Sequence, residues 1–259
     1  MYQNKFIVFV DILGFGALVE RSGATPGLAE SILDTLLSMN PDRLQETMYG
    51  SLNEEKIPKD ELAGAKEALA IIHEHMSNHH HITISYFSDS LVLSADDDNI
   101  IASQSILELL AKLSIELWNN YSLLIRGGMT LGKLVHNDNG PIFGPAMNRA
   151  YFLESKEANT PRIIIDEHCI DHFQKVSTFS NFESLIEKDD NYSYISLPAC
   201  FRYITTASSL CFSESSQLEI VESAQTEVLQ KIRQIISSDL PQKVKDKYIW
   251  LEAETIRTI

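Results

Sequence analysis

Two aspartates stand beside short apolar runs and could hold divalent cations. Asp11 follows the run 5–10, whose Phe, Ile and Val residues predict a buried strand. Asp89 lies between two strand-like runs, 82–86 and 91–95, and therefore at the tip of a predicted β-hairpin. A carboxylate at a strand end can bind Mg²⁺ or Mn²⁺. Each aspartate taken alone is more often a helix cap or a turn residue, so only a combination of groups would indicate a site.

Arg126 and Asn148 add groups that could meet an anion or a ribose. Arg126 lies in the apolar segment 123–135, where a guanidinium is costly unless it meets an anion. A phosphate and an internal carboxylate would both serve. Asn148 lies near the start of a predicted helix, 146–155, where it could donate a hydrogen bond to a ribose or phosphate or simply begin the helix.

The spacing of apolar residues predicts the elements that must position these groups. Helices are expected at 28–39, 62–76 and 100–118, strands at 162–166 and 192–197, and mostly helix over 216–259 with a break at Pro241. A polar segment at about 40–62, bracketed by Pro41 and Pro58, indicates an insertion. This order predicts an α+β sheet domain over residues 1–200 and a helical C-terminal extension over 201–259.

Composition narrows the classes of partner. The net charge of −15 argues against duplex nucleic acid, whose binding depends on Lys and Arg. An acidic protein that binds a triphosphate needs divalent metal between the like charges. No apolar run has the length of a membrane span, and the start of the chain lacks a signal-peptide pattern. The three cysteines have no metal-ligand spacing, so we expect reduced thiols and a cytoplasmic protein without membrane contact.

Taken in order, these segments resemble the class III nucleotidyl cyclases, the family of adenylate and guanylate cyclases. The family pattern is a strand-end Asp with Ile-x-Gly-Phe, a hairpin Asp, an Arg-x-Gly strand, and Ile-Trp-Gly leading to a helix with Val-Asn. Its counterparts here are the segments 11–15, 87–89, 126–128 and 142–148. The resemblance covers about residues 5–200 and implies a ferredoxin-like-derived antiparallel sheet with helices packed on it.

The resemblance also implies roles for individual residues. Asp11, Asp89 and the Ile12 carbonyl would hold two divalent cations, Mn²⁺ or Mg²⁺, in the two-metal arrangement of phosphoryl transfer. The remaining implied roles concern the nucleotide. The amides of Leu13, Gly14 and Phe15 would bind phosphate, Arg126 would neutralise the triphosphate, Asn148 would orient the ribose, and Arg149 is a candidate for a missing transition-state arginine.

Three positions depart from the purine cyclases. Ser85 stands four residues before Asp89, where those enzymes place the Lys or Glu that reads the base. Pro141 replaces an Asp seven residues before Asn148, and Phe152 replaces the transition-state Arg four residues after it. The pattern around Tyr86-Phe-Ser-Asp-Ser is similar to the pyrimidine cyclases of the bacterial Pycsar antiphage system, which make cyclic UMP or cyclic CMP. Ser85 and Tyr86 would then contact the smaller base.

The resemblance further implies a head-to-tail homodimer with shared active sites, because family sites form between two domains and this chain carries one. A cyclic-nucleotide-activated effector would act downstream in antiphage defence. Two alternatives stay open. The chain could be a purine (ATP or GTP) cyclase that reads its base with other residues. It could instead be an inactive cyclase-like domain that senses nucleotides or only dimerises, which the phenylalanine at 152 favours and the two aspartates disfavour.

Overall fold

The computed structural model describes residues 1–41, 43–44, 57–79, 81–138, 140–175, 182–208 and 214–257. Most of the predicted insertion, residue 42 and residues 45–56, lies outside these ranges, as do the last two residues of the predicted C-terminal helix. Among the described residues, no helix is both long and apolar enough to cross a membrane.

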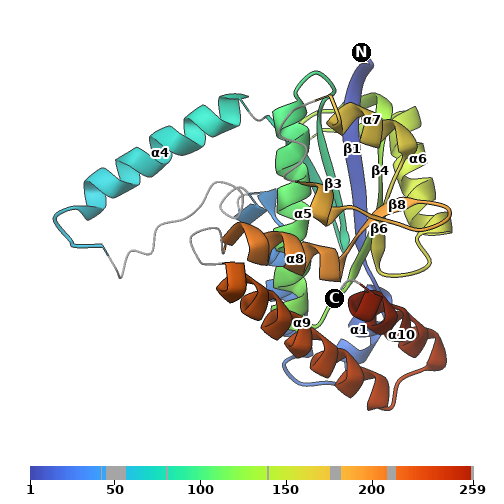
Figure 1. The fold of residues 1–259 in the computed structure, drawn as a ribbon. Helices are drawn as coiled ribbons and strands as arrows, with labels where there is room; N and C mark the ends of the chain where they lie inside the picture. The colour runs from blue at the N-terminus through green and yellow to red at the C-terminus, as the bar shows by residue number, and fades with distance from the viewer. Residues whose placement is uncertain are drawn as a thin grey trace.

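A mixed sheet forms the centre of the fold (Figure 1). Its strands are β1 Gln3–Ile12, β2 Thr83–Phe87, β3 Ser90–Asp96, β4 Ile125–His136, β5 Ile142–Phe143, β6 Arg162–Ile165, β7 Glu187–Lys188 and β8 Ser193–Ser196. The strand order is β2-β3-β1-β4-β6-β8-β7, with β5 paired to β4. Neighbouring strands are antiparallel except for the parallel pair of β4 and β6. The predicted strands and the hairpin around Asp89 are therefore confirmed.

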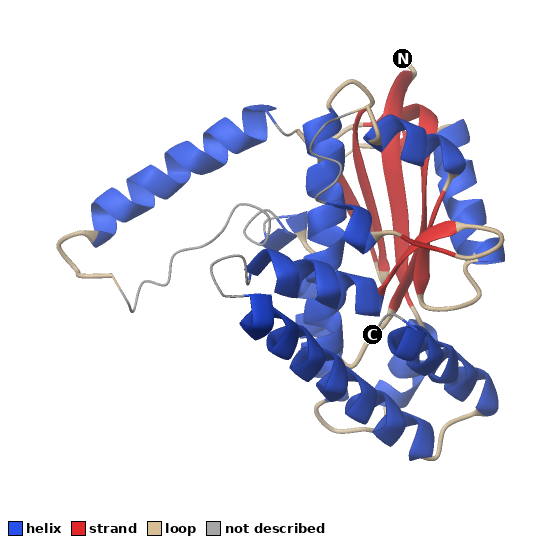
Figure 2. Cartoon of the chain, viewed as in Figure 1, coloured by secondary structure: helices blue, strands red, loops and turns tan. Residues whose placement is uncertain are grey.

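Helices lie on both sides of the sheet (Figure 2). They are α1 Phe15–Ser22, α2 Leu28–Ser38, α4 Leu62–His79, α5 Ile100–Tyr121, α6 Pro145–Phe152, α7 Glu167–Phe173, α8 Leu197–Ser208, α9 Glu214–Ser237 and α10 Gln242–Arg257. The break at Pro241 falls between α9 and α10, as predicted. The sequence did not predict α1, because two glycines suggested only a turn. Gly14 has φ 80°, a left-handed conformation that favours glycine, and it directly precedes α1.

The two faces of the sheet are covered differently. On one face α5 packs over the main hydrophobic core, which includes the fully buried side chains of Phe6 and Val8. The other face carries α6 and a smaller cluster with Ile7 and Phe9. We call it the α6 face. Because side chains alternate along a strand, Asp11 falls on the α6 face with Ile7 and Phe9.

Gly128 allows α6 and the turn after it to lie directly on β4. A Cβ atom at this position would stand 2.4 Å from the Leu153 Cβ and 2.5 Å from the Ala150 carbonyl oxygen. Real Cβ atoms do not approach backbone so closely. The glycine pair of β4 is therefore required by packing, and it brings the residues after α6 down to the strand that carries Arg126.

Gly128→Ala is expected to lower the free energy of unfolding by about 3 kcal/mol, because the new methyl group has to push the helix away from the strand. Gly132→Ala in the same strand is the matched control. There the added Cβ would lie 3.5 Å from the Ala146 Cβ, an ordinary van der Waals contact. Urea unfolding of both variants checks the expectation, and equal stabilities would contradict it.

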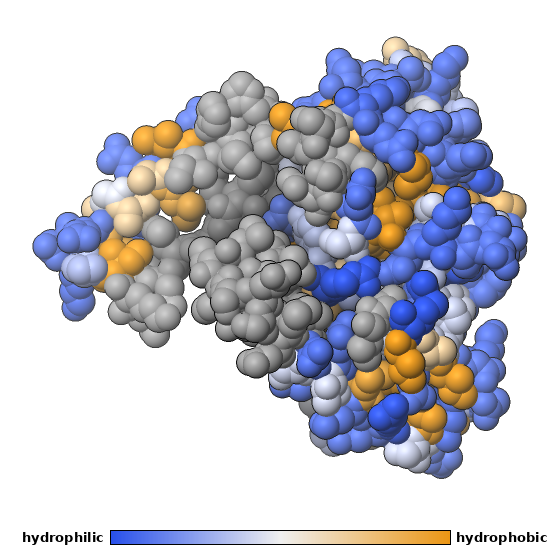
Figure 3. All heavy atoms as spheres, viewed as in Figure 1, coloured by the Kyte–Doolittle hydropathy of each residue, from blue (hydrophilic) through white to orange (hydrophobic). Residues whose placement is uncertain are grey.

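The C-terminal extension packs on the sheet domain. Leu251 of α10 is fully buried in a cluster that contains Leu13, just after β1, and Leu124, just before β4. Figure 3 shows apolar side chains among the hydrophilic ones over α9 and α10, where Ile249 and Ile256 are exposed. Helix α8 spans residue 200, so the extension continues from the sheet domain without a break in the helix.

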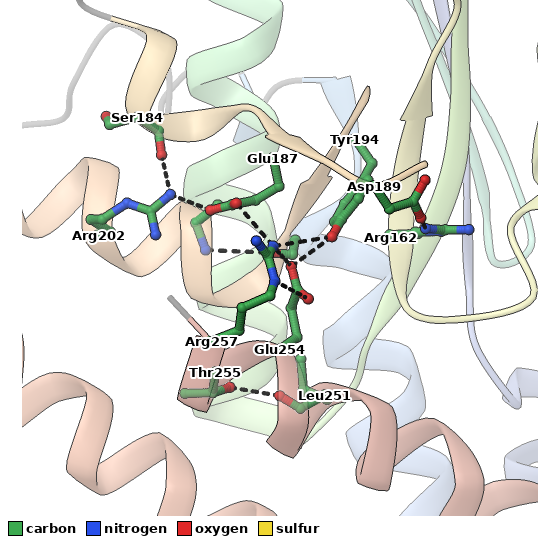
Figure 4. Close-up of polar contacts among 12 residues, drawn as sticks. Arg162, Ser184, Glu187, Asp189, Tyr194, Arg202, Leu251, Glu254, Thr255 and Arg257 are labelled. Atoms are coloured by element: carbon green, nitrogen blue, oxygen red, sulfur yellow. Dashed lines mark hydrogen bonds and ion pairs between the residues drawn. The ribbon is translucent and has the colours of Figure 1, made fainter. Parts of the chain in front are cut away.

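A polar cluster fixes the end of α10 to the last strands (Figure 4). The Tyr194 hydroxyl donates to Glu254 Oε1 at 2.8 Å, and the Arg257 guanidinium donates to the same oxygen at 2.7 Å. Arg257 also donates to Glu187 of β7 at 3.0 Å. Since Glu254 and Glu187 lie on different elements and share one guanidinium, this cluster holds α10 in a defined position against the sheet.

Candidate active site

The carboxyl groups of Asp11 and Asp89 converge at one end of the sheet. Asp11 is paired in register with Ser90 of β3, and the Ser90 hydroxyl donates to Asp11 Oδ1 at 3.2 Å. The Ile12 amide donates to the Asp89 backbone carbonyl at 3.1 Å, which ties the hairpin tip to the end of β1. Two aspartates far apart in the sequence therefore belong to one group.

Asp11 is short of positive charge. Burial raises its pKa to about 6, and the charge of Asp89 acts in the same direction. Arg126 lowers the pKa, but not enough to cancel these two effects. Its closest guanidinium nitrogen lies 3.7 Å from Asp11 Oδ2. A cation bound between two partly buried carboxylates favours their charged forms, because it offsets the repulsion between them.

Arg126 is held by a carboxylate that the sequence did not identify. The side chain of Glu154 is 3% exposed, and its Oε1 lies 2.7 Å from an Arg126 guanidinium nitrogen. Of the two anions that the sequence allowed for Arg126, the structure supplies the internal carboxylate. Burial raises the pKa of Glu154, and the charge of Arg126 lowers it.

Glu154 reaches this position through a local change of helix type. After α6 the chain continues as a π-helical turn, Leu153–Glu157, so the predicted helix 146–155 is confirmed with an altered last turn. Such turns occur frequently at functional sites. Because Arg126 lies in an apolar strand, the sequence indicated that it needs an anion such as a buried carboxylate. Nothing in the local sequence identifies Glu154 as that residue.

Lys247 of α10 is a second residue that sequence reasoning missed. Its side chain is half-buried, and the charges of Arg126 and Asp11 both act on its ammonium group. Burial lowers the pKa of Lys247, the positive charges of Arg126 and Lys243 act in the same direction, and Asp11 opposes them with a smaller effect. Lys247 precedes Leu251 by one helical turn, so it shares the face of α10 that packs on the sheet domain. The extension therefore places a positive charge within electrostatic range of Asp11.

The turn after Asp11 offers amides for an anion, with one change from expectation. The Leu13 amide already donates to the Leu124 carbonyl at 2.8 Å, so it is occupied. Phe15 begins α1, and the first amides of a helix have no partner within that helix. The amides of Gly14 and Phe15 are therefore still candidates for binding a phosphate, whereas the Leu13 amide is used in the hydrogen bond that joins the end of β1 to the start of β4.

Ser85 and Tyr86 point to opposite faces of the sheet. Ser85 pairs with Val92, which belongs to the cluster on the α6 face, whereas Tyr86 pairs with Leu91 of the main core. Only Ser85 therefore shares a face with Asp11. The expectation that both residues contact one base does not fit this alternation within a single chain.

Asn148 and Arg149 lie on α6, away from the aspartate pair. Asn148 is exposed, and six residues of helix separate it from Glu154, about 9 Å along the axis. The Arg149 guanidinium donates to both Asp166 oxygens at 3.0 Å, and the Thr130 hydroxyl donates to the same carboxylate at 2.8 Å. In this structure Arg149 is thus engaged beside the middle of β4.

The donor set fits hard divalent cations. Carboxylate and carbonyl oxygens are the ligands that Mg²⁺ and Mn²⁺ prefer, and these are the groups of Asp11, Asp89 and Ile12 that the sequence predicts as ligands. Within the residues that the structure describes, no group of three or more His, Cys, Asp or Glu side chains is arranged to hold a metal ion.

No family model and no curated protein matches this sequence. Among solved structures, the chain is similar to the adenylyl cyclase CyaB from P. aeruginosa, with 14% identity and a TM-score of 0.45 over 75% of this chain and 94% of that one. It is also similar to the dimeric guanylyl cyclase domain of the RhoGC fusion protein from the aquatic fungus Blastocladiella emersonii, with 14% identity and a TM-score of 0.41 over 75% of this chain and 93% of that one. For the guanylate cyclase domain of RhGC from Catenaria anguillulae in complex with GTP, the identity is 11% and the TM-score 0.34, over 75% of this chain and 97% of that one. Similarity at this level does not assign a function, which has to be inferred from the residues of the site.

Proposed function

We propose that this chain is a metal-dependent nucleotidyl cyclase of the class III kind, which converts a pyrimidine nucleoside triphosphate to its 3′,5′-cyclic nucleotide and pyrophosphate. The observation that carries the proposal is the convergence of Asp11 and Asp89, two acidic side chains whose burial and mutual charge outweigh the effect of Arg126 on Asp11. The raised pKa of Asp11, about 6, supports a cation as the missing partner.

Divalent cations held by Asp11, Asp89 and the Ile12 carbonyl would neutralise the triphosphate and favour ionisation of the ribose 3′-hydroxyl. In the reaction the 3′-oxygen forms a bond to the α-phosphorus as the bond to the bridging oxygen of pyrophosphate breaks. The amides of Gly14 and Phe15 would hold phosphate oxygens at the start of α1. These groups position the triphosphate at the end of β1.

Cationic side chains would stabilise the charge that builds up on the leaving pyrophosphate. Arg126 is held beside Asp11 by Glu154, which fixes its guanidinium before substrate binds. Lys247 adds an ammonium group at the same end of the sheet. We assign to Lys247 part of the charge that an arginine at the position of Phe152 would otherwise supply.

The active form is proposed to be a head-to-tail homodimer. Asn148 would orient the ribose, but α6 holds it one and a half turns from Glu154 and exposes it to solvent. A partner chain could present its own Asn148 to Asp11 and Asp89. Exposed aromatic rings on or beside α6 support an interface there, since Tyr151 is 53% and Phe152 43% exposed.

A pyrimidine is proposed because Ser85, on the α6 face, replaces the long base-reading side chains of purine cyclases. The cyclic nucleotide made by the enzyme would be a second messenger that activates a separate effector in antiphage defence. We place the enzyme in the cytoplasm. Both of these biological points follow from the resemblance of the sequence and not from the geometry of the site.

Incubation of the purified protein with Mn²⁺ or Mg²⁺ and each of the four ribonucleoside triphosphates tests the function. Mass spectrometry is expected to find cyclic UMP or cyclic CMP and pyrophosphate, and light scattering a dimer. Asp89→Asn should abolish the product while keeping the melting temperature. If only cyclic purine nucleotides form, the protein is a purine cyclase and the pyrimidine assignment is wrong. If nucleotides bind but no product forms, the chain is a nucleotide-sensing domain and not an enzyme.

A further inference from the structure

A buried histidine lies behind the residue proposed to contact the base. His136, the last residue of β4, is 3% exposed. Its Nε2 lies 2.9 Å from the Ser85 hydroxyl oxygen, and its Nδ1 lies 2.8 Å from the Ser94 hydroxyl oxygen. One imidazole therefore connects β2, β3 and β4 on the α6 face.

The ring is neutral at physiological pH. Burial lowers the pKa of His136 to about 4, and the positive charge of Lys5 acts in the same direction. Asp138 opposes them with a smaller effect. A neutral imidazole carries one N–H and one unprotonated nitrogen. One of the two serines must therefore accept a hydrogen bond from the ring, and the other must donate to it.

Burial of Ser94 decides which serine donates. Its side chain is fully buried, and His136 Nδ1 is the one hydrogen-bond partner of its hydroxyl among the described residues. If Ser94 only accepted, its own O–H would be buried without an acceptor, which costs free energy. Ser94 therefore donates to Nδ1, and the ring proton is on Nε2. Nε2–H then donates to Ser85, whose own O–H remains available.

We propose that His136 is a positioning residue for substrate specificity, which turns Ser85 into a hydrogen-bond donor toward the base and so favours uracil over cytosine. This inference rests on the proposed cyclase function. Position 4 of uracil carries a carbonyl oxygen, which accepts a hydrogen bond, whereas position 4 of cytosine carries an amino group, which donates. A serine that already accepts from Nε2–H has its own O–H free and is polarised into a stronger donor and a poorer acceptor, so it matches the carbonyl better than the amino group.

Ser94→Ala tests the relay without touching the substrate. Loss of the bond to Nδ1 releases the ring to carry its proton on either nitrogen. When the proton is on Nδ1, the Ser85 O–H donates to Nε2, and Ser85 can then only accept from the base. The ratio of kcat/KM for UTP to that for CTP is expected to fall about threefold to tenfold, mainly through KM. Ser103→Ala is the control, because Ser103 is equally buried but lies on α5, where its hydroxyl donates to the carbonyl of Asn99 at the start of that helix. An unchanged ratio in the Ser94 variant would overturn the proposal.

The ring proton can be located independently of turnover. In histidine labelled with ¹⁵N, the resonances of His136, assigned by their loss in His136→Gln, are expected to show a protonated Nε2 and an unprotonated Nδ1. A proton on Nδ1 would refute the relay even in an active enzyme. If the labelled protein shows the expected tautomer but forms no cyclic nucleotide, the cyclase function fails while the hydrogen-bond network stands. UTP and CTP binding to the Asp89→Asn variant then decides whether the network still favours uracil.

Discussion

Asp11→Asn is expected to remove cyclic-nucleotide formation and, at pH 7 without metal, to make the protein more stable than the wild type. The pKa of Asp11 is about 6 in the folded protein and near 3.8 in the unfolded chain. An acid whose pKa is raised by folding contributes full stability below pH 3.8 and loses it as the pH rises through 6. Asparagine carries no charge at either pH, so it avoids this loss, which amounts to about 2–3 kcal/mol.

Urea unfolding at pH 4 and pH 7 measures this effect. The stability difference between Asp11→Asn and the wild type should grow with pH, whereas Asp98→Asn, in the exposed turn before α5, should show the same small difference at both values. Addition of Mn²⁺ should stabilise the wild type and leave the stability of Asp11→Asn unchanged, because the cation binds to the negative charge of the Asp11 carboxylate, which asparagine does not carry. A difference that does not vary with pH, or an active variant, would contradict the role given to Asp11.

Arg126→Ala is expected to destabilise the protein by about 3–5 kcal/mol and to reduce turnover about 100-fold or more. The loss of stability arises because Glu154 would stay buried with no cation at 2.7 Å. The loss of turnover arises because the guanidinium beside Asp11 would no longer stabilise charge on the triphosphate. These two consequences have different causes and can be separated.

The double variant Arg126→Ala/Glu154→Gln separates them. A neutral glutamine needs no cation, so most of the stability should return, while the activity should not. Arg233→Ala is the matched control, since Arg233 pairs with Glu252 at 2.6 Å on the exposed surface of α9 with a side chain that is 59% exposed. Its loss should cost less than about 1 kcal/mol. Recovery of activity in the double variant would show that Arg126 acts only on Glu154 and not on substrate.

Local sequence patterns were sufficient for most of the elements. The apolar run before Asp11 predicted β1, the two runs around Asp89 predicted the hairpin, and helical spacing predicted α5. In each case the pattern repeats with the period of the element, so neighbouring residues carry the information. The missed helix α1 contains Gly16 and follows Gly14, and glycine weakens the helical signal.

The sequence by itself determined which residue types the site has to contain. Two aspartates at strand ends and an arginine in an apolar strand that needs an anion can be read from the spacing and types of residues, and the resemblance to the cyclases adds a serine where a longer base-reading side chain is expected. Only the tertiary structure decided their partners. Glu154 pairs with Arg126, Ser94 and Ser85 share His136, and α10 places Lys247 within electrostatic range of Asp11. These contacts join residues far apart in the chain, and they depend on strand register, on the Gly128 contact with α6 and on the docking of α10, none of which a local pattern encodes.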